Sequence, residues 1–224
     1  MAIQRLLGGG WLVLVGGGEF SFGETAEIDQ AWLQLAGEGS VGFLPTASGS
    51  ADYFHHFAEY LDEKYDRTVE LIPVYRGRDA RRQKNAERID ECAAIYIGGG
   101  VPDDFLSTVS ESPIQEALGR KLGSGGVVVA IAAAAQAMGQ TARSLYGGAS
   151  LPGMGWLPGG VVEPNFDPGH DRRLRRMMTE PGVTWGVGLP ASSAILLGPD
   201  NQANLVGTSF LLEDPEGDFR ILGG

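Results

Sequence analysis

The sequence contains very little cysteine and histidine, and it lacks long apolar runs. Its single cysteine, Cys92, excludes an internal disulfide framework and is typical of a reducing cytoplasm, where we expect the protein to reside. Two of its three histidines, His55 and His56, are neighbours, so on a helix they point about 100° apart and cannot share one metal ion. No apolar run approaches the length of a membrane span. We therefore expect no metal, no cofactor and no membrane partner.

Positive charge is also scarce. Lys and Arg number 17 against 28 Asp and Glu, which gives a formal net charge of -11. Such a surface repels phosphate groups and anionic lipid, so nucleic acid is not an expected partner. The apolar run near the N-terminus is interrupted by glycines at 8–10, and we interpret Trp11–Val15 as a first core strand rather than part of a signal peptide. No linker or repeat divides the chain, and residues 1–224 are expected to form a single domain.

The glycine-rich turns at 16–18 and 98–100 each follow an apolar run. Neither turn has the G-x-G-x-x-G spacing of dinucleotide-binding proteins or the lysine of a Walker motif. Glycine turns of this kind serve packing in most α/β proteins, so they do not by themselves indicate a nucleotide site.

Short apolar runs alternate with amphipathic segments along most of the chain. This alternation predicts an α/β three-layer sandwich with a mostly parallel central sheet, and the turn signals near residues 199–201 and 215–217 predict antiparallel hairpins at one sheet edge near the C-terminus. A capping box over Ser21–Glu24 predicts a helix that runs to about Gly37. Further helices are expected at 52–65, 85–92, 114–122, 133–143 and 167–179. Strands are expected at 11–15, 41–44, 68–74, 93–97, 127–131, 183–187, 193–197, 203–208 and 210–212.

The segment Val127–Gly139 reads V-V-V-A-I-A-A-A-A-Q-A-M-G, a buried strand followed directly by a helix. In α/β hydrolases such a junction carries the nucleophile on a sharp turn within a G-x-S-x-G motif. Here alanine stands at the position of the nucleophile. The alanine run also has a simpler explanation, because alanine is the strongest helix former and suits a closely packed helix start.

Five segments, in order, resemble the cyanophycinase and dipeptidase E family of serine peptidases, which have the class I glutamine amidotransferase-like fold. Leu44–Ser48 is similar to the family's I-P-T-A-S segment, and Gly99–Leu106 to its G-G-N/D-Q/P-x-x-x-L turn. Ala130–Gly139 falls on the elbow G-T-S-A-G-A-x-x-M-G, Leu157–Asp167 on L-P-G-x-x-x-D-x-H-F-D, and Gly186–Ala194 on G-I-G-I-D-E-x-T-A. The resemblance implies this fold, a serine-peptidase ancestry and a homodimer.

The departures from the family pattern fall on the reactive positions. The resemblance places the nucleophile at Ala132, the histidine at Asn165 and the acidic residue at Ala191. The elbow glycines become Ala130 and Ala134, which suggests a relaxed turn or displaced neighbours, and the polar residue of the glycine turn becomes Val101.

A serine attacks only when a base accepts its proton and a third group orients that base. Alanine has no such proton, and asparagine is no base near neutral pH. We therefore predict a pseudoenzyme that binds a small peptide-like or acidic ligand, with Gly98, Gly99, Gly100, Val101 and Ala133 forming an anion-binding pocket. An engineered replacement of serine at position 132 alone would not account for Asn165 and Ala191.

The alternative is a working hydrolase with relocated chemistry. Asp167, His170 and Asp171 are spaced to share one helical turn and could supply an acid/base group, although such a cluster more often forms a capped, solvated helix start. The adjacent arginines at 172, 173, 175 and 176 form a charge run that suits a solvated face, an acidic small ligand or a partner subunit.

Overall fold

A computed structural model describes residues 3, 5 and 8–223. Its largest sheet has seven strands in the order β11-β10-β1-β5-β4-β2-β3. These strands are β1 (Trp11–Val15), β2 (Val41–Leu44), β3 (Val69–Leu71), β4 (Ala94–Ile97), β5 (Val127–Ile131), β10 (Ala194–Leu197) and β11 (Ala203–Val206). The first five are parallel, whereas β10 and β11 add an antiparallel hairpin at one edge. The predicted α/β architecture is confirmed.

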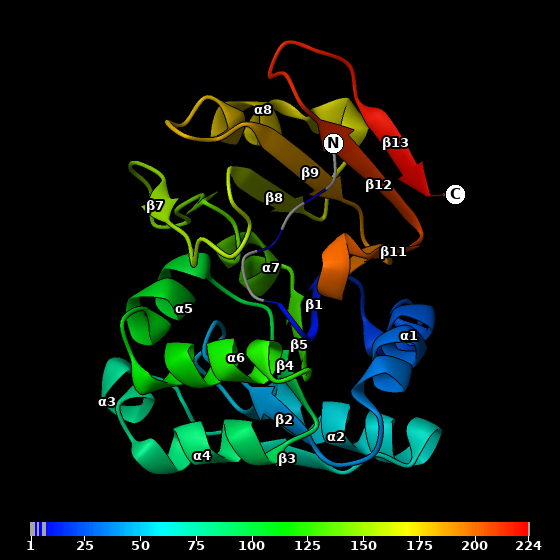
Figure 1. The fold of residues 1–224 in the computed structure, drawn as a ribbon, viewed down its shortest axis with the longest axis vertical. Coiled ribbons are helices and arrows are strands. Elements are labelled where there is room, and N and C mark those ends of the chain that lie inside the picture. The colour runs from blue at the N-terminus through cyan, green and yellow to red at the C-terminus, as the bar shows by residue number, and fades with distance from the viewer. Residues whose placement is uncertain (1–2, 4, 6–7, 224) are drawn as a thin grey trace.

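Helices cover both faces of this sheet (Figure 1). One face carries α1 (Ala26–Ala36) and α2 (Asp52–Tyr65). The other carries α4 (Gln83–Glu91), α5 (Pro102–Val109) and α6 (Pro113–Gly123), with the short α3 (Gly77–Ala80) beside them.

The central strands are buried on both faces, as parallel strands between helix layers must be. In β5, Val127, Val129 and Ile131 pack toward α1 and α2, whereas Val128 and Ala130 pack toward the opposite helices. The same alternation holds in β1 and β4. Because β1, β5 and β4 run in parallel, their carboxyl ends lie at one edge of the sheet, where the candidate site is found.

A second sheet packs above that edge, in the order β13-β12-β9-β8 (Figure 1). Its strands are β8 (Gly160–Pro164), β9 (Trp185–Leu189), β12 (Thr208–Leu212) and β13 (Arg220–Gly223), and α8 (Arg172–Met178) packs against it. The sequence predicted β12 at the edge of the main sheet and did not predict β8. Both differences have one cause: Val161 of β8, Leu212 of β12 and the apolar side chains of α8 bury a cluster with Phe166 that is separate from the main core.

The predicted helix at 133–143 is wrong over its second half. Helix α7 (Ala133–Ala137) is short, and the chain then continues through β6 (Thr141–Ala142) and pairs with β7 (Leu151–Pro152). The N–H of Gln140 donates to the carbonyl of Gly160 at 2.7 Å, so tertiary pairing replaces the helical hydrogen bonds that alanine-rich sequence favours.

Two helix starts also differ from the prediction. Ser21 does not cap α1; Glu19 instead caps the 3-10 turn η1 (Phe20–Phe22), and the carboxylate of Glu24 accepts from the N–H of Glu19 at 2.8 Å. The helix predicted at 167–179 is divided into the 3-10 turn η2 (Pro168–His170) and α8. Among the described residues, no helix is long and apolar enough to cross a membrane.

Phe57 on α2 offers a direct test of this core. Its ring is fully buried and lies 5.6 Å from that of Phe20, 5.5 Å from Phe43 and 4.3 Å from Tyr96, measured between centroids. We expect Phe57→Ala to lower the free energy of unfolding by about 3–5 kcal/mol in urea titrations, because it opens a cavity among these rings. The matched control is Phe22→Ala, at an 82% exposed ring, which should change it by less than about 0.5 kcal/mol. Similar effects of the two substitutions would contradict the packing described.

Candidate functional site

The junction between β5 and α7 forms a strained elbow at Ala132. This residue has φ 52° and ψ −115°, a backbone conformation that a residue with a Cβ atom rarely adopts. Its N–H donates to the carbonyl of Val15 at 2.9 Å, and its carbonyl accepts from the N–H of Gln136 at 3.0 Å. The elbow is therefore held from both sides, and the expectation of a relaxed turn is wrong.

The two alanines that flank the elbow do not prevent this geometry. Ala130 and Ala134 are both fully buried, and their methyl groups belong to the main apolar core. The strained elbow therefore forms with alanine at both positions.

A cavity of about 340 Å³ opens directly at the elbow. We call it the elbow pocket, and its lining comes from the carboxyl ends of β1, β2, β4 and β5 together with α2 and the segment after β8. The lining residues are Gly17, Gly18, Phe43, Ser48, Tyr53, Gly98, Gly99, Ile131, Ala132 and Asn165. Four residues predicted from the sequence are among them: Gly98, Gly99, Ala132 and Asn165.

The other predicted pocket residues support the elbow pocket without lining it. Gly100 has φ 148°, and a Cβ atom there would lie 2.1 Å from the carbonyl oxygen of Ala47. The N–H of Val101 donates to the carbonyl of Ala47 at 2.7 Å, and this hydrogen bond holds the glycine turn at 98–100 against the turn after β2. Ala133 is the first residue of α7, so its N–H has no acceptor within the helix.

Asn165 packs closely against the glycine turn at 16–18. Its backbone is also left-handed, with φ 47°, and its N–H donates to the carbonyl of Gly16 at 2.9 Å. A Cβ atom on Gly17 would lie 2.1 Å from the side-chain oxygen of Asn165, so only glycine allows this approach. The adjacent N–H of Ser192 donates to the carbonyl of Gly17 at 3.1 Å. Ala191 itself is exposed and lines neither this pocket nor the larger one beside it.

Sequence reasoning missed two polar residues of the elbow pocket, Ser48 and Tyr53. Burial, and then the nearby Glu19, raise the pKa of the Tyr53 phenol, so its hydroxyl stays protonated and can donate a hydrogen bond. The Ser48 hydroxyl lies 3.0 Å from the carbonyl oxygen of Pro45 and 3.1 Å from that of Ser50, so its one proton is shared between these two acceptors. The place of Tyr53, one turn before Phe57 on the same helix face, was a signal that could have identified it.

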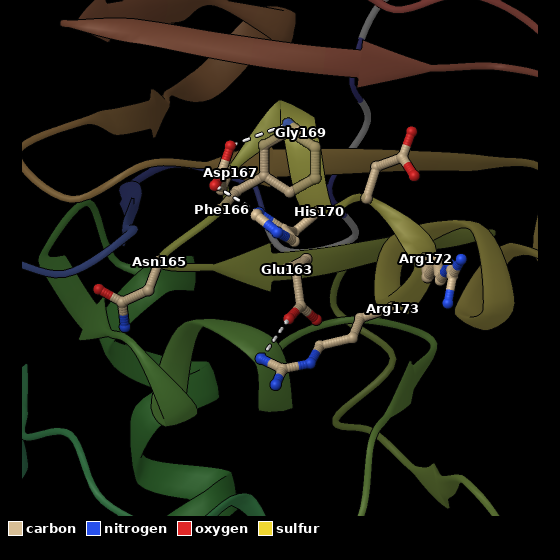
Figure 2. Close-up of a pocket in the computed structure, with 9 residues that line it drawn as sticks. Glu163, Asn165, Phe166, Asp167, Gly169, His170, Arg172 and Arg173 are labelled. Atoms are coloured by element: carbon tan, nitrogen blue, oxygen red, sulfur yellow. Dashed lines mark hydrogen bonds and ion pairs between the residues drawn. The ribbon is translucent and has the colours of Figure 1, made fainter.

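A second, larger cavity of about 650 Å³ shares Asn165 with the elbow pocket (Figure 2). It brings together the predicted group Asp167, His170 and Asp171 with Arg172 and Arg173. The Nδ1 atom of His170 lies 2.7 Å from Asp167 Oδ2, and this hydrogen bond, with one from the N–H of Gly169, lowers the pKa of Asp167. The His170 side chain is 86% exposed, and no serine, threonine or cysteine lines the cavity.

Glu163, which the sequence analysis did not single out, lies at the inner wall of this second cavity. It is only 4% exposed, and burial raises its pKa, although Arg143, Arg173 and a hydrogen bond from Gln136 oppose that shift. Figure 2 shows the guanidinium of Arg173 directed at its carboxylate, at 3.9 Å. The family-like segment offered the signal, since Glu163 stands where that pattern has an acidic residue. Across the described residues, no three His, Cys, Asp or Glu side chains gather closely enough to hold a metal ion.

The elbow strain can be measured by replacing Ala132 with glycine. A positive φ costs a residue with a Cβ atom about 1–3 kcal/mol, and glycine avoids this cost. The greater conformational freedom of glycine in the unfolded chain reduces the resulting gain in stability by about 0.4–1 kcal/mol. We expect Ala132→Gly to raise the free energy of unfolding by about 1 kcal/mol in chemical denaturation. Ala135→Gly, within α7, is the control and should lower it by about 1 kcal/mol or more. A similar loss in both variants would show that Ala132 is not strained.

Two solved structures superimpose on most of this chain. A crystal structure of a peptidase from an acI-B1 actinobacterium superimposes with a TM-score of 0.79 at 20% sequence identity, over 98% of this chain and 96% of that one. A candidate peptidase E protein from Listeria monocytogenes EGD-e superimposes with a TM-score of 0.64 at 13% identity, over 88% of this chain and 97% of that one. At these identities the likeness establishes the fold alone.

Among curated proteins there is no significant sequence match. The family model for Peptidase family S51, in contrast, matches residues 12–200, which span the elbow, both glycine turns and the segment of Asn165. By this match over most of its length, the chain belongs to Peptidase family S51.

Proposed function

We propose that this chain is a pseudoenzyme of the S51 peptidases, which uses the elbow pocket to bind a small peptide-like or acidic ligand without cleaving it. The observation that carries the proposal is Ala132. It keeps a strained elbow conformation at the mouth of a 340 Å³ pocket, but its side chain is a methyl group. A nucleophile at this position would need a hydroxyl or thiol with a proton to lose.

The residues around Ala132 support the same conclusion. Asn165 reaches the pocket where the family pattern has histidine, and its amide cannot accept a proton near neutral pH. Ala191, at the family's acidic position, is exposed and offers no group that could orient a base. What persists is the binding part of the site: the hydroxyl of Tyr53 and an apolar wall that includes Phe43.

The proposal predicts that hydrolysis is absent and that Ala132→Ser alone does not restore it, because the new hydroxyl would have no base. We would measure turnover of Asp-X dipeptides and β-aspartyl-arginine, together with labelling by a serine-reactive fluorophosphonate, for the wild type and for Ala132→Ser. The matched variant combines Ala132→Ser with Asn165→His and Ala191→Glu, and gain of labelling only there would support the mapping. Turnover by the wild-type protein would overturn the proposal.

Binding is tested separately with the same dipeptides by calorimetry. Gly99 lines the elbow pocket, and a Cβ atom there would make only ordinary contact, 3.5 Å from the methyl group of Ala132. A longer side chain would project into the pocket, so we expect Gly99→Leu to weaken binding at least tenfold. Gly77→Leu, at an open surface position, is the control and should leave binding unchanged. Equal affinities in both variants would exclude the elbow pocket as the binding site.

A second candidate function is hydrolysis by relocated residues, favoured by the hydrogen bond between Asp167 and His170 at the second cavity. An imidazole oriented by a carboxylate can activate a water molecule as a general base. This candidate predicts that His170→Ala abolishes an activity of the wild type while the unfolding midpoint stays the same. Because the ring is largely exposed and none of the described residues that line the cavity is a serine, threonine or cysteine, we rank it second.

A further inference from the structure

A third cavity, of about 190 Å³, lies between the loop at 143–150 and α8. Three arginines line it: Arg143 from the end of β6, and Arg173 and Arg176 from α8. Ser144 and Ser150 complete its polar wall, together with the backbone of two adjacent glycines. We call it the arginine pocket; it shares no lining residue with the elbow pocket.

Arg143, which lines this pocket, has a buried donor without a partner among the described residues. Its Nε atom is buried and, in that part of the chain, has no hydrogen-bond partner. Leaving a buried polar group unpaired costs about 1–3 kcal/mol, so this donor favours a ligand that supplies an acceptor.

Positive charge at the pocket is only partly balanced. One carboxylate oxygen of Glu163 lies 3.9 Å from Arg143 and 3.9 Å from Arg173, while its other oxygen accepts from Gln136 at 3.2 Å. A single buried carboxylate is thus shared by two guanidinium groups. Within the described part of the chain, Arg176 forms no ion pair at all.

Two other carboxylates accept hydrogen bonds from the serines of this wall. Glu180 accepts from the hydroxyl of Ser150 at 2.6 Å, and Asp103 accepts from Ser144 at 2.5 Å and from the N–H of Leu145 at 2.9 Å. Neither carboxylate lines the pocket. The wall therefore presents cations to its interior, in a chain whose formal net charge is -11.

We propose that the arginine pocket binds the oxyanion of a small molecule, either a phosphate or a carboxylate group. Guanidinium groups recognise both through paired N–H donors, and several arginines around one point suit a multiply charged anion. The volume is below the roughly 300–1,000 Å³ of pockets for drug-sized ligands, so it matches an anionic group with a small carrier rather than a whole peptide. The site is separate from the elbow pocket and does not depend on the function proposed there.

Calorimetric titration at low ionic strength with inorganic phosphate, and separately with acetate, tests this site and distinguishes its two possible ligands. We expect saturable one-site binding of at least one anion by the wild-type protein. Arg176→Gln removes an exposed, unpaired charge and should weaken binding at least tenfold. Arg143→Lys keeps the positive charge beside Glu163 but removes the paired N–H donors of the guanidinium group, so it should also weaken binding at least tenfold. Arg172→Gln, on α8 but lining the second cavity, should change the affinity less than twofold.

A nitrogen-detected NMR experiment gives an independent readout, since the Nε–H resonance of Arg143 should shift on addition of the anion that binds. Absence of saturable binding by both anions would overturn the proposal. So would an equal loss of affinity in Arg172→Gln and Arg176→Gln, because that result would place the anion in the second cavity. Unchanged unfolding midpoints in the variants ensure that a loss of binding does not reflect a loss of fold.

Discussion

The hydrogen bond from the N–H of Ala132 to the carbonyl of Val15 joins the elbow to the end of the neighbouring strand. It extends the parallel pairing of β1 and β5 by one residue beyond the strand and helps to hold Ala132 at a positive φ. Because the strain is local and the pairing is part of the sheet, the fold maintains this turn without any contribution from a side chain at position 132. The elbow pocket exists where it does because this bond and the glycine turns set the backbone around it.

Asn165 connects this elbow to the smaller sheet. Its backbone bond to Gly16 and its side chain against Gly17 bring the segment after β8 onto the turn after β1. The elbow pocket and the second cavity share Asn165, and the second cavity and the arginine pocket share Arg173. Cavities of different polarity therefore adjoin one another through these two residues.

The elbow pocket and the arginine pocket differ in the charge of the residues that line them. The elbow pocket is lined mainly by apolar side chains and backbone, and its polar side chains are those of Ser48, Tyr53 and Asn165. The arginine pocket is strongly cationic. The buried carboxylate of Glu163 balances part of this charge, and it is itself paired with the guanidinium groups of Arg143 and Arg173. A buried carboxylate with imperfect partners has little value for stability alone, which is consistent with a role at a binding surface.

Sequence alone determined the α/β architecture and the central strands, because apolar periodicity is a local property. The resemblance to a known family, rather than periodicity, pointed to Ala132 and Asn165, which the structure places at one pocket with Gly98 and Gly99. The sequence did not reveal that α7 ends at Ala137, that β8 and β12 form a separate sheet, or that Glu163 meets Arg143 and Arg173. Those features depend on contacts between residues far apart in the chain. Propensity favours continuing the alanine helix, but pairing of Gln140 with Gly160 decides otherwise, and only the tertiary structure contains that partner.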